Sequence, residues 1–454
     1  MFVSIFVLFL MAYSAWPGSK SIFVIFSFSF SALLYFAIKS YLSAGYLFLA
    51  SALWIGYWLK LSLHIIQPAL PWMEPIGYFD FSNSAWDEVA IIATIGAFGV
   101  LVGGFLCYSL CGLFNSNYIT YERTSRFRIV CWIVGLSAVF SIIVLNEKFS
   151  IVHQSIPPSE LGLPFHLQGF FNWLMGGGGL LLLMIPLYLE VISGNFLCGT
   201  GLVLLASVFI GVSLWSRGTV VFQSLIFIIS LYVYKAYLPK FNMDQLLKLF
   251  GLMVSAIVLS VGLSEVRREV FFASVKPVSA QPVSAQPVLS SYSLFLILKL
   301  PVERWIGLEG VMAMSAYPSK STGLLLHAID EKRLIGKIDM YTHTVALSPS
   351  IDTKTVMYAT PPSLFAFWYY SGSLFVVFIG SVVLTLLVLA AERLIFFTSH
   401  NPFLSAAVGV GGAIQLVHLG TGGLFMPAVI FAMSLSFALL IGYWSKYSYH
   451  KESN

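Results

Sequence analysis

The chain of 454 residues is 58% hydrophobic and 16% aromatic, and only 9% of its residues are charged, with a formal net charge of +5. A soluble domain carries about a quarter of its residues as charged side chains, so this composition excludes a soluble protein and favours one covered by lipid. The mean hydropathy of +0.89 agrees, and the small basic excess indicates membrane orientation rather than a nucleic-acid partner.

Apolar runs long enough to cross a bilayer recur along the whole chain. One of them, VAIIATIGAFGVLVGGFLCYSLCGLF at 89–114, exceeds the roughly 20 residues that a span requires. We therefore predict an all-α polytopic membrane protein. Twelve spanning helices are expected near residues 1–17, 20–38, 42–65, 89–114, 128–146, 168–189, 199–215, 219–237, 249–265, 363–391, 403–420 and 423–445. The first is expected to be a retained helix, because it lacks the basic stretch that opens a signal peptide.

Lysine and arginine in the short loops predict the orientation of these helices, since cytoplasmic loops carry the basic excess. Loop 115–128 contains three arginines and loop 234–248 contains three lysines. The short loops on the opposite side hold only four basic residues, Lys20, Lys60, Lys148 and Arg217. Both termini are therefore predicted to be cytoplasmic, and the segment between helices nine and ten is predicted to lie outside.

Three parts follow from this topology. Residues 1–265 hold the first nine helices, 266–360 form a large external loop with short helices, and 361–454 hold the last three helices. Within the loop, the tandem VSAQP at 275–291 predicts an extended linker. Residues 361–371 are expected to form a half-helix at the membrane surface before the tenth span.

Charge is concentrated in KLPVERWIGLEG, residues 299–310 of the external loop. Gly307 and Gly310 predict a turn or a close backbone approach, which would allow Arg304 and Glu309 to point into one cavity. The alternative is a surface salt bridge covered by Trp305. His327 is a further candidate for acid–base chemistry, although it also suits a solvated face.

Further arginines are predicted near the same membrane face. Arg217 ends the seventh helix, and Arg267 and Arg268 stand at the exit of the ninth. Guanidinium groups match phosphate oxygens bidentately, so these residues could bind an anion. The alternative roles are orientation anchors at the membrane surface and local pairing with Glu265 and Glu269.

No metal or cofactor site is expected. The four cysteines are predicted to lie in helices or near their cytoplasmic ends, and the sequence contains no Walker loop, HExxH, GxSxG or paired CxxC. Few charges fall in the middle of the predicted helices, which disfavours an ion-coupled transporter.

The pattern resembles the Wzy-type oligosaccharide repeat-unit polymerases, which include the O-antigen polymerases. The resemblance is carried by WSRGTVVFQSLIFIISLYVYK at 215–235, by TPPSLFAFWYYSGSLFVVFIGSVV at 360–383, and by the large external loop with arginines. It implies a multi-pass protein of the bacterial inner membrane that transfers a glycan from undecaprenyl pyrophosphate to a second lipid-linked repeat unit on the periplasmic face. Its partners would be that lipid-linked oligosaccharide, the bilayer and a chain-length regulator.

Local chemistry and this resemblance together suggest roles for nine residues. Arginines can stabilise a departing pyrophosphate without a metal, and a carboxylate or imidazole can accept the proton of the acceptor hydroxyl. The expected catalytic residues are Glu309, Arg304 and, as a substitute base, His327. The expected pyrophosphate ligands are Arg217, Arg267 and Arg268. Aromatic rings offer faces for sugar or lipid, and those expected to do so are Trp305, Tyr369 and Tyr370.

Three other functions stay open. An O-antigen ligase would share the lipid-linked donor and the external arginines. A lipid-linked oligosaccharide flippase would need a charge-lined cavity, for which the sequence offers few charges. A receptor or assembly scaffold would require no catalysis.

Overall fold

The computed structural model describes most of the chain. The described residues are 2–68, 70, 72, 74–111, 125–149, 151, 167–214, 216, 218–274, 302, 305, 307–331, 339–347, 361–420 and 423–452. Within these residues every named element is a helix, and one isolated bridge joins Gly420 to Gly423. The predicted all-α class is therefore confirmed for the described part of the chain.

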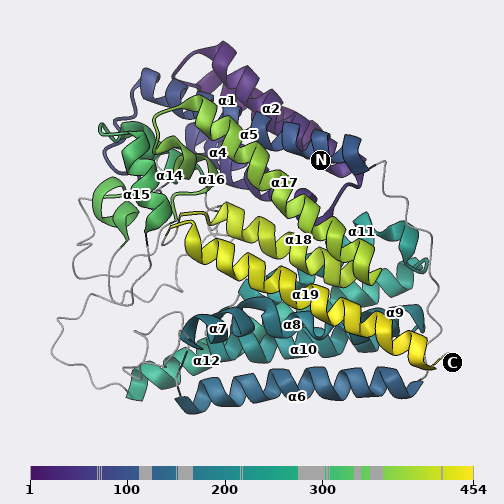
Figure 1. The fold of residues 1–454 in the computed structure, drawn as a ribbon. Coiled ribbons are helices and arrows are strands. Elements are labelled where there is room, and N and C mark those ends of the chain that lie inside the picture. Colours follow the sequence, from purple (N-terminus) through teal and green to yellow (C-terminus); the bar gives the residue numbers. More distant parts are fainter. Residues whose placement is uncertain are drawn as a thin grey trace. The chain divides into compact units, whose positions relative to one another are not determined.

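The helices follow the apolar runs of the sequence (Figure 1). In the first half they are α1 (Phe2–Ala15), α2 (Lys20–Ser40), α3 (Ala44–Leu53), the π-helix η1 (Trp54–Leu59), α4 (Lys60–Ile66), α5 (Asn83–Cys111), α6 (Ser125–Phe149), α7 (Leu167–Trp173), the π-helix η3 (Leu174–Gly178), α8 (Gly179–Leu181), α9 (Met184–Ile192), α10 (Phe196–Leu214) and α11 (Gly218–Val233). In the second half they are the 3-10 turn η4 (Lys235–Tyr237), α12 (Met243–Ser274), α14 (Leu308–Ala316), α15 (Thr322–Asp330), the π-helix η5 (Tyr341–Val345), α16 (Leu364–Tyr369), α17 (Leu374–Ser399), α18 (Pro402–Val417) and α19 (Phe425–Glu452).

Nine helical stretches of the described residues are long and apolar enough to cross a bilayer. Three shorter apolar helices accompany them at Val3–Ala15, Gly218–Val233 and Pro402–Val417. The chain therefore has the composition and helix lengths of a multi-pass membrane protein. The count of twelve crossings and the orientation stay predictions.

The first compact unit comprises residues 1–114, 287–390 and 409–432. Here α2 packs along α5, and the short helices α14 and α16 pack against α5 and against each other (Figure 1). With 9 and 6 residues, α14 and α16 are too short to span a bilayer. The segment predicted as an external loop therefore contributes the short helix α14, which folds onto α5.

The second compact unit comprises residues 115–286, 391–408 and 433–454. Its centre is α10, which packs against α6, α9, α11 and α12. Asn401 ties α18 into this unit, since its side-chain amide donates to the carbonyl of Met184 over 3.0 Å. Helices α17, α18 and α19 each contribute residues to both units.

Several features differ from the expected ones. Helix α12 continues to Ser274, past residue 265 where the ninth span was expected to end. Residues 363–391 were expected as one span, but α16 ends at Tyr369 and α17 begins at Leu374. This break gives the short helix predicted at 361–371. Lys60, counted above among loop residues, is a fully buried helix residue in α4, so its charge carries no information on orientation.

Candidate functional site

Glu309 and Lys60 form a buried ion pair in the first unit. Lys60 Nζ lies 2.7 Å from Glu309 Oε1, and the two side chains are 0% and 2% exposed. Lys60 also donates to the carbonyl of Trp305 over 2.7 Å. Glu309 lies in the first turn of α14, where a negative charge interacts favourably with the helix dipole. The pair therefore joins a span to the first turn of a short helix.

Two glycines allow α14 to approach its neighbours closely, as the sequence predicted. A Cβ at Gly307 would lie 2.6 Å from the Tyr57 ring, and a Cβ at Gly310 would overlap the carbonyl of Pro362. Ser363 completes this contact, because its hydroxyl lies 2.8 Å from the Tyr57 hydroxyl and donates to the carbonyl of Gly307 over 3.1 Å. The start of α14 is thus fixed against both η1 and α16.

A cluster of the partly exposed Glu88 and Lys320 with the buried Tyr369, here called the Glu88 cluster, lies beside the other end of α14. The Tyr369 hydroxyl donates to Glu88 over 2.9 Å, and Lys320 Nζ lies 3.7 Å from the same carboxylate. Lys320 also lies 5.3 Å from the centre of the Tyr369 ring and donates to the carbonyl of Ser315. Burial and the Glu88 carboxylate raise the pKa of Tyr369, so its hydroxyl stays a donor at neutral pH.

The remaining aromatic candidates have different surroundings. Trp305 is half-buried, and its ring centre lies 5.9 Å from that of Phe48. Tyr370 is 1% exposed, and its carbonyl accepts a hydrogen bond from the Ser321 amide. In this conformation Tyr370 is a core residue whose ring offers no face to a sugar.

Tyr341 was not singled out from the sequence, yet it occupies a distinctive position in the first unit. Its ring is buried, and its hydroxyl has no hydrogen-bond partner among the described residues. Burial, with the negative charges of Glu309, Glu74 and Asp339, raises the pKa of Tyr341. A buried hydroxyl without a partner is costly, so this position suits a water molecule or a ligand hydroxyl.

His327 is exposed on α15, where its Nδ1 lies 3.0 Å from the sulfur of Met340. Glu331 accepts a hydrogen bond from the Met340 amide over 2.5 Å. Burial raises the pKa of Glu331, although the Met340 hydrogen bond acts in the opposite direction. His327 and Glu331 therefore both contact Met340.

The predicted arginines are described only in part. Arg217, Arg304 and the side chain of Arg268 lie outside the described residues. Arg267 belongs to the second unit, where it donates to both oxygens of Glu147 over 2.8 and 2.7 Å and to the carbonyl of Val212 over 2.8 Å. Glu147 neutralises the charge of Arg267 in this conformation.

Lys60, Glu88 and Lys320 were missed as functional candidates. A lysine inside an apolar helix is a signal in itself, because an ionisable residue at membrane depth needs a partner. Glu88 and Lys320 carry no such signal, since their contact depends on how α14 and α16 pack against α5. Among the described residues no group of three His, Cys, Asp or Glu side chains is placed to hold a metal ion.

Comparison with known proteins gives no relative. No protein-family model matches the chain, and neither a curated protein nor a solved structure is detectably similar to it.

Proposed function

We propose that this protein is a polymerase of the bacterial inner membrane that joins undecaprenyl-pyrophosphate-linked oligosaccharide repeat units on the periplasmic face. In this reaction the bond between the donor sugar and pyrophosphate breaks. A hydroxyl of a second repeat unit forms the new glycosidic bond, its proton passes to a carboxylate, and undecaprenyl pyrophosphate leaves. The proposal rests on the resemblance stated above and on one observation in the first unit.

That observation is the Glu88 cluster beside short helices that do not span. Its carboxylate is 40% exposed and the Lys320 side chain is 19% exposed, so a polar ligand can reach both. The carboxylate provides a proton acceptor and the ammonium provides a cation for phosphate oxygens. Tyr369 is only 7% exposed, so its hydroxyl holds the Glu88 carboxylate in place and its ring offers little face to a sugar. We assign proton transfer to Glu88.

The proposed role of Glu309 changes accordingly. A general base must come within hydrogen-bonding distance of the hydroxyl that it deprotonates. Glu309 is buried and held by Lys60, so an acceptor reaches it only if the start of α14 moves. We therefore propose that Glu309 positions α14. Arg217, Arg267 and Arg268 remain the proposed pyrophosphate ligands, and Arg304 remains a proposed catalytic residue.

A reconstituted assay tests this proposal. The protein is placed in liposomes with undecaprenyl-pyrophosphate-linked repeat units extracted from the producing cells, and products are separated as a glycan ladder. Loss of a general base lowers rates by about a hundredfold or more, so we expect Glu88→Gln to lose the ladder. The matched control is Asp244→Asn, which removes an exposed carboxylate paired with Lys248 in α12.

Three outcomes would overturn the proposal. A normal ladder from Glu88→Gln would remove Glu88 from the reaction. Transfer to lipid A core, with no ladder from repeat units alone, would identify a ligase instead. Movement of the lipid-linked oligosaccharide across the bilayer without new glycosidic bonds would identify a flippase.

A further inference from the structure

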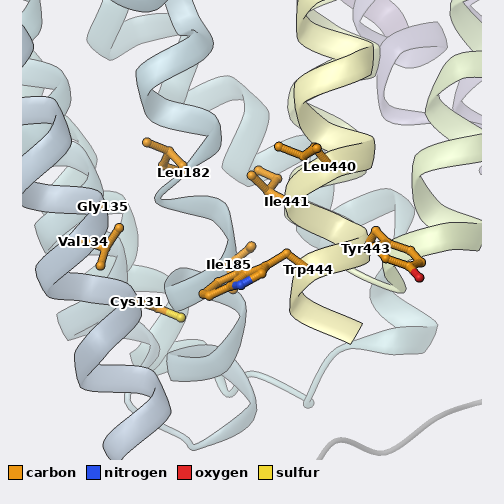
Figure 2. Close-up of a pocket in the computed structure, with 9 residues that line it drawn as sticks. All are labelled: Cys131, Val134, Gly135, Leu182, Ile185, Leu440, Ile441, Tyr443 and Trp444. Atoms are coloured by element: carbon orange, nitrogen blue, oxygen red, sulfur yellow. The ribbon is translucent and has the colours of Figure 1, made fainter. Parts of the chain in front are cut away.

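A groove of about 530 Å³ opens between α6, α9 and α19 in the second unit. Its floor is formed by Cys131, Ile185 and Ile441, which are only 6–7% exposed. Figure 2 shows the Trp444 indole extending from α19 toward Ile185. The volume of the groove lies in the range of about 300–1,000 Å³ that is typical of ligand pockets.

The rim of the groove is exposed. Val134 on α6 and Leu440, Tyr443 and Trp444 on α19 are 47–69% exposed. All four belong to helical stretches that are apolar and long enough to span a bilayer. A hollow with a buried apolar floor and exposed apolar walls in such helices faces hydrocarbon rather than water.

One end of the groove carries basic residues. Trp444 contacts Phe127, with 5.8 Å between the ring centres, and Phe127 is flanked by Arg126 and Arg128 in the first turn of α6. Tryptophan and tyrosine are enriched at the level of lipid headgroups. Trp444, Tyr443 and the two arginines therefore mark the headgroup end of the groove.

At the basic end of the groove, Arg128 is paired with a carboxylate and Arg126 is the arginine that could bind a ligand. Arg128 Nε lies 3.3 Å from Glu190 Oε1, which also accepts from the Trp132 indole over 3.1 Å. Arg126 is exposed and pairs with no carboxylate among the described residues. Among the described residues at this end, two guanidiniums against one carboxylate leave a net positive charge, which complements an anionic headgroup.

We infer that this groove binds an anionic phospholipid of the bilayer, with one acyl chain along the apolar floor and the headgroup phosphate near Arg126 and Arg128. The apolar groove would bind the acyl chain, and its basic end would bind the headgroup. The predicted topology places that end on the cytoplasmic side, where anionic lipids attract basic residues. The groove shares no residue with the proposed transferase site.

Native mass spectrometry of the full-length protein tests the inference. Phosphatidylglycerol, phosphatidylethanolamine with the same acyl chains, and undecaprenyl phosphate are titrated separately. We expect phosphatidylglycerol to bind most tightly. Each arginine near an anionic headgroup contributes about fivefold in affinity, so Arg126→Gln should weaken phosphatidylglycerol binding by about fivefold and leave phosphatidylethanolamine unchanged.

A second pair of variants tests the groove itself. Val134→Trp/Leu440→Trp adds volume at two exposed rim positions and should abolish retention of phosphatidylglycerol. Ile133→Trp is the matched control, because Ile133 is equally exposed on α6 and does not line the groove. A single symmetric gel-filtration peak for each variant establishes that it folds.

Three results would overturn the inference. Retention of phosphatidylglycerol by the filled variant would place the lipid elsewhere. Equal binding of the two phospholipids would remove the headgroup contact. Tighter binding of undecaprenyl phosphate than of phosphatidylglycerol would assign the groove to an isoprenoid chain.

Discussion

Lys60 Nζ lies 2.7 Å from Glu309 Oε1, although 249 residues separate the two in the chain. The contact joins α4 to α14 in a buried setting where an unpaired charge is costly. It explains why a lysine stands within an apolar helix and why the charged stretch at 299–310 carries a glutamate. The pair organises the first unit around the start of α14.

Removal of one partner should destabilise the protein strongly. Lys60→Met leaves a buried carboxylate without its cation, and the expected loss is about 3–5 kcal/mol. Lys60→Met/Glu309→Met removes both charges and should recover most of the stability, because a hydrophobic pair can replace a buried ion pair at little cost. Thermal unfolding in detergent measures both.

The same double variant distinguishes a structural role of Glu309 from a catalytic one. If Glu309 only positions α14, Lys60→Met/Glu309→Met should form the glycan ladder. A stable double variant without any ladder would contradict this positioning role and return Glu309 to the chemistry.

The sequence predicted the helices better than the contacts between them. Long apolar runs located the spans, and PPSLFAFWYYSG predicted the short helix that became α16. Gly307 and Gly310 correctly predicted a close approach, since only glycine leaves room for a neighbouring backbone or ring. These features depend on local composition, which a single sequence contains.

The candidate site was less predictable because its contacts connect distant segments. Glu88 meets Lys320 and Tyr369 only through the packing of α14 and α16 on α5. Tyr369 and Tyr370 are both buried, at 7% and 1% exposed, yet only the Tyr369 hydroxyl donates to Glu88. Neighbouring aromatic residues thus differ in role because the backbone turns between them.

Gly310→Ala should destabilise the first unit, because the added Cβ would overlap the carbonyl of Pro362 and backbone must move to relieve it. We expect a loss of about 1–3 kcal/mol, as for overpacking in a core. Gly262→Ala in α12 is the control. Its Cβ would meet no atom within 4 Å, and alanine favours a helix by about 1 kcal/mol over glycine. Equal melting temperatures for the two variants would contradict the predicted steric conflict.

Glu331 should make the stability of the protein depend on pH. Burial raises the pKa of Glu331 above its ordinary value of 4.5, so the native state binds this proton more tightly than the unfolded chain does. The stabilisation is present below the ordinary pKa and is lost as pH rises through the raised value. The midpoint temperature of thermal unfolding in detergent should therefore fall over that interval.

Glu331→Gln should remove this pH dependence, because glutamine does not titrate. Asp330→Asn changes the exposed neighbouring carboxylate and should leave it intact. A pH dependence that survives Glu331→Gln would assign the effect to another group.

Arg267 and Glu147 offer a test of the proposed pyrophosphate site, because the Arg267 guanidinium donates to both oxygens of the Glu147 carboxylate in this structure. The pair is partly exposed, and such pairs contribute about 1 kcal/mol or less to stability, so neither Arg267→Gln nor Glu147→Gln should unfold the protein. If Arg267 binds the pyrophosphate, the two variants should differ in function. Arg267→Gln loses the cation and should raise the KM for the lipid-linked donor, whereas Glu147→Gln removes a competitor and should lower it. Equal KM values for both variants, measured from ladder formation against donor concentration, would leave Arg267 as a structural link between α12 and α6.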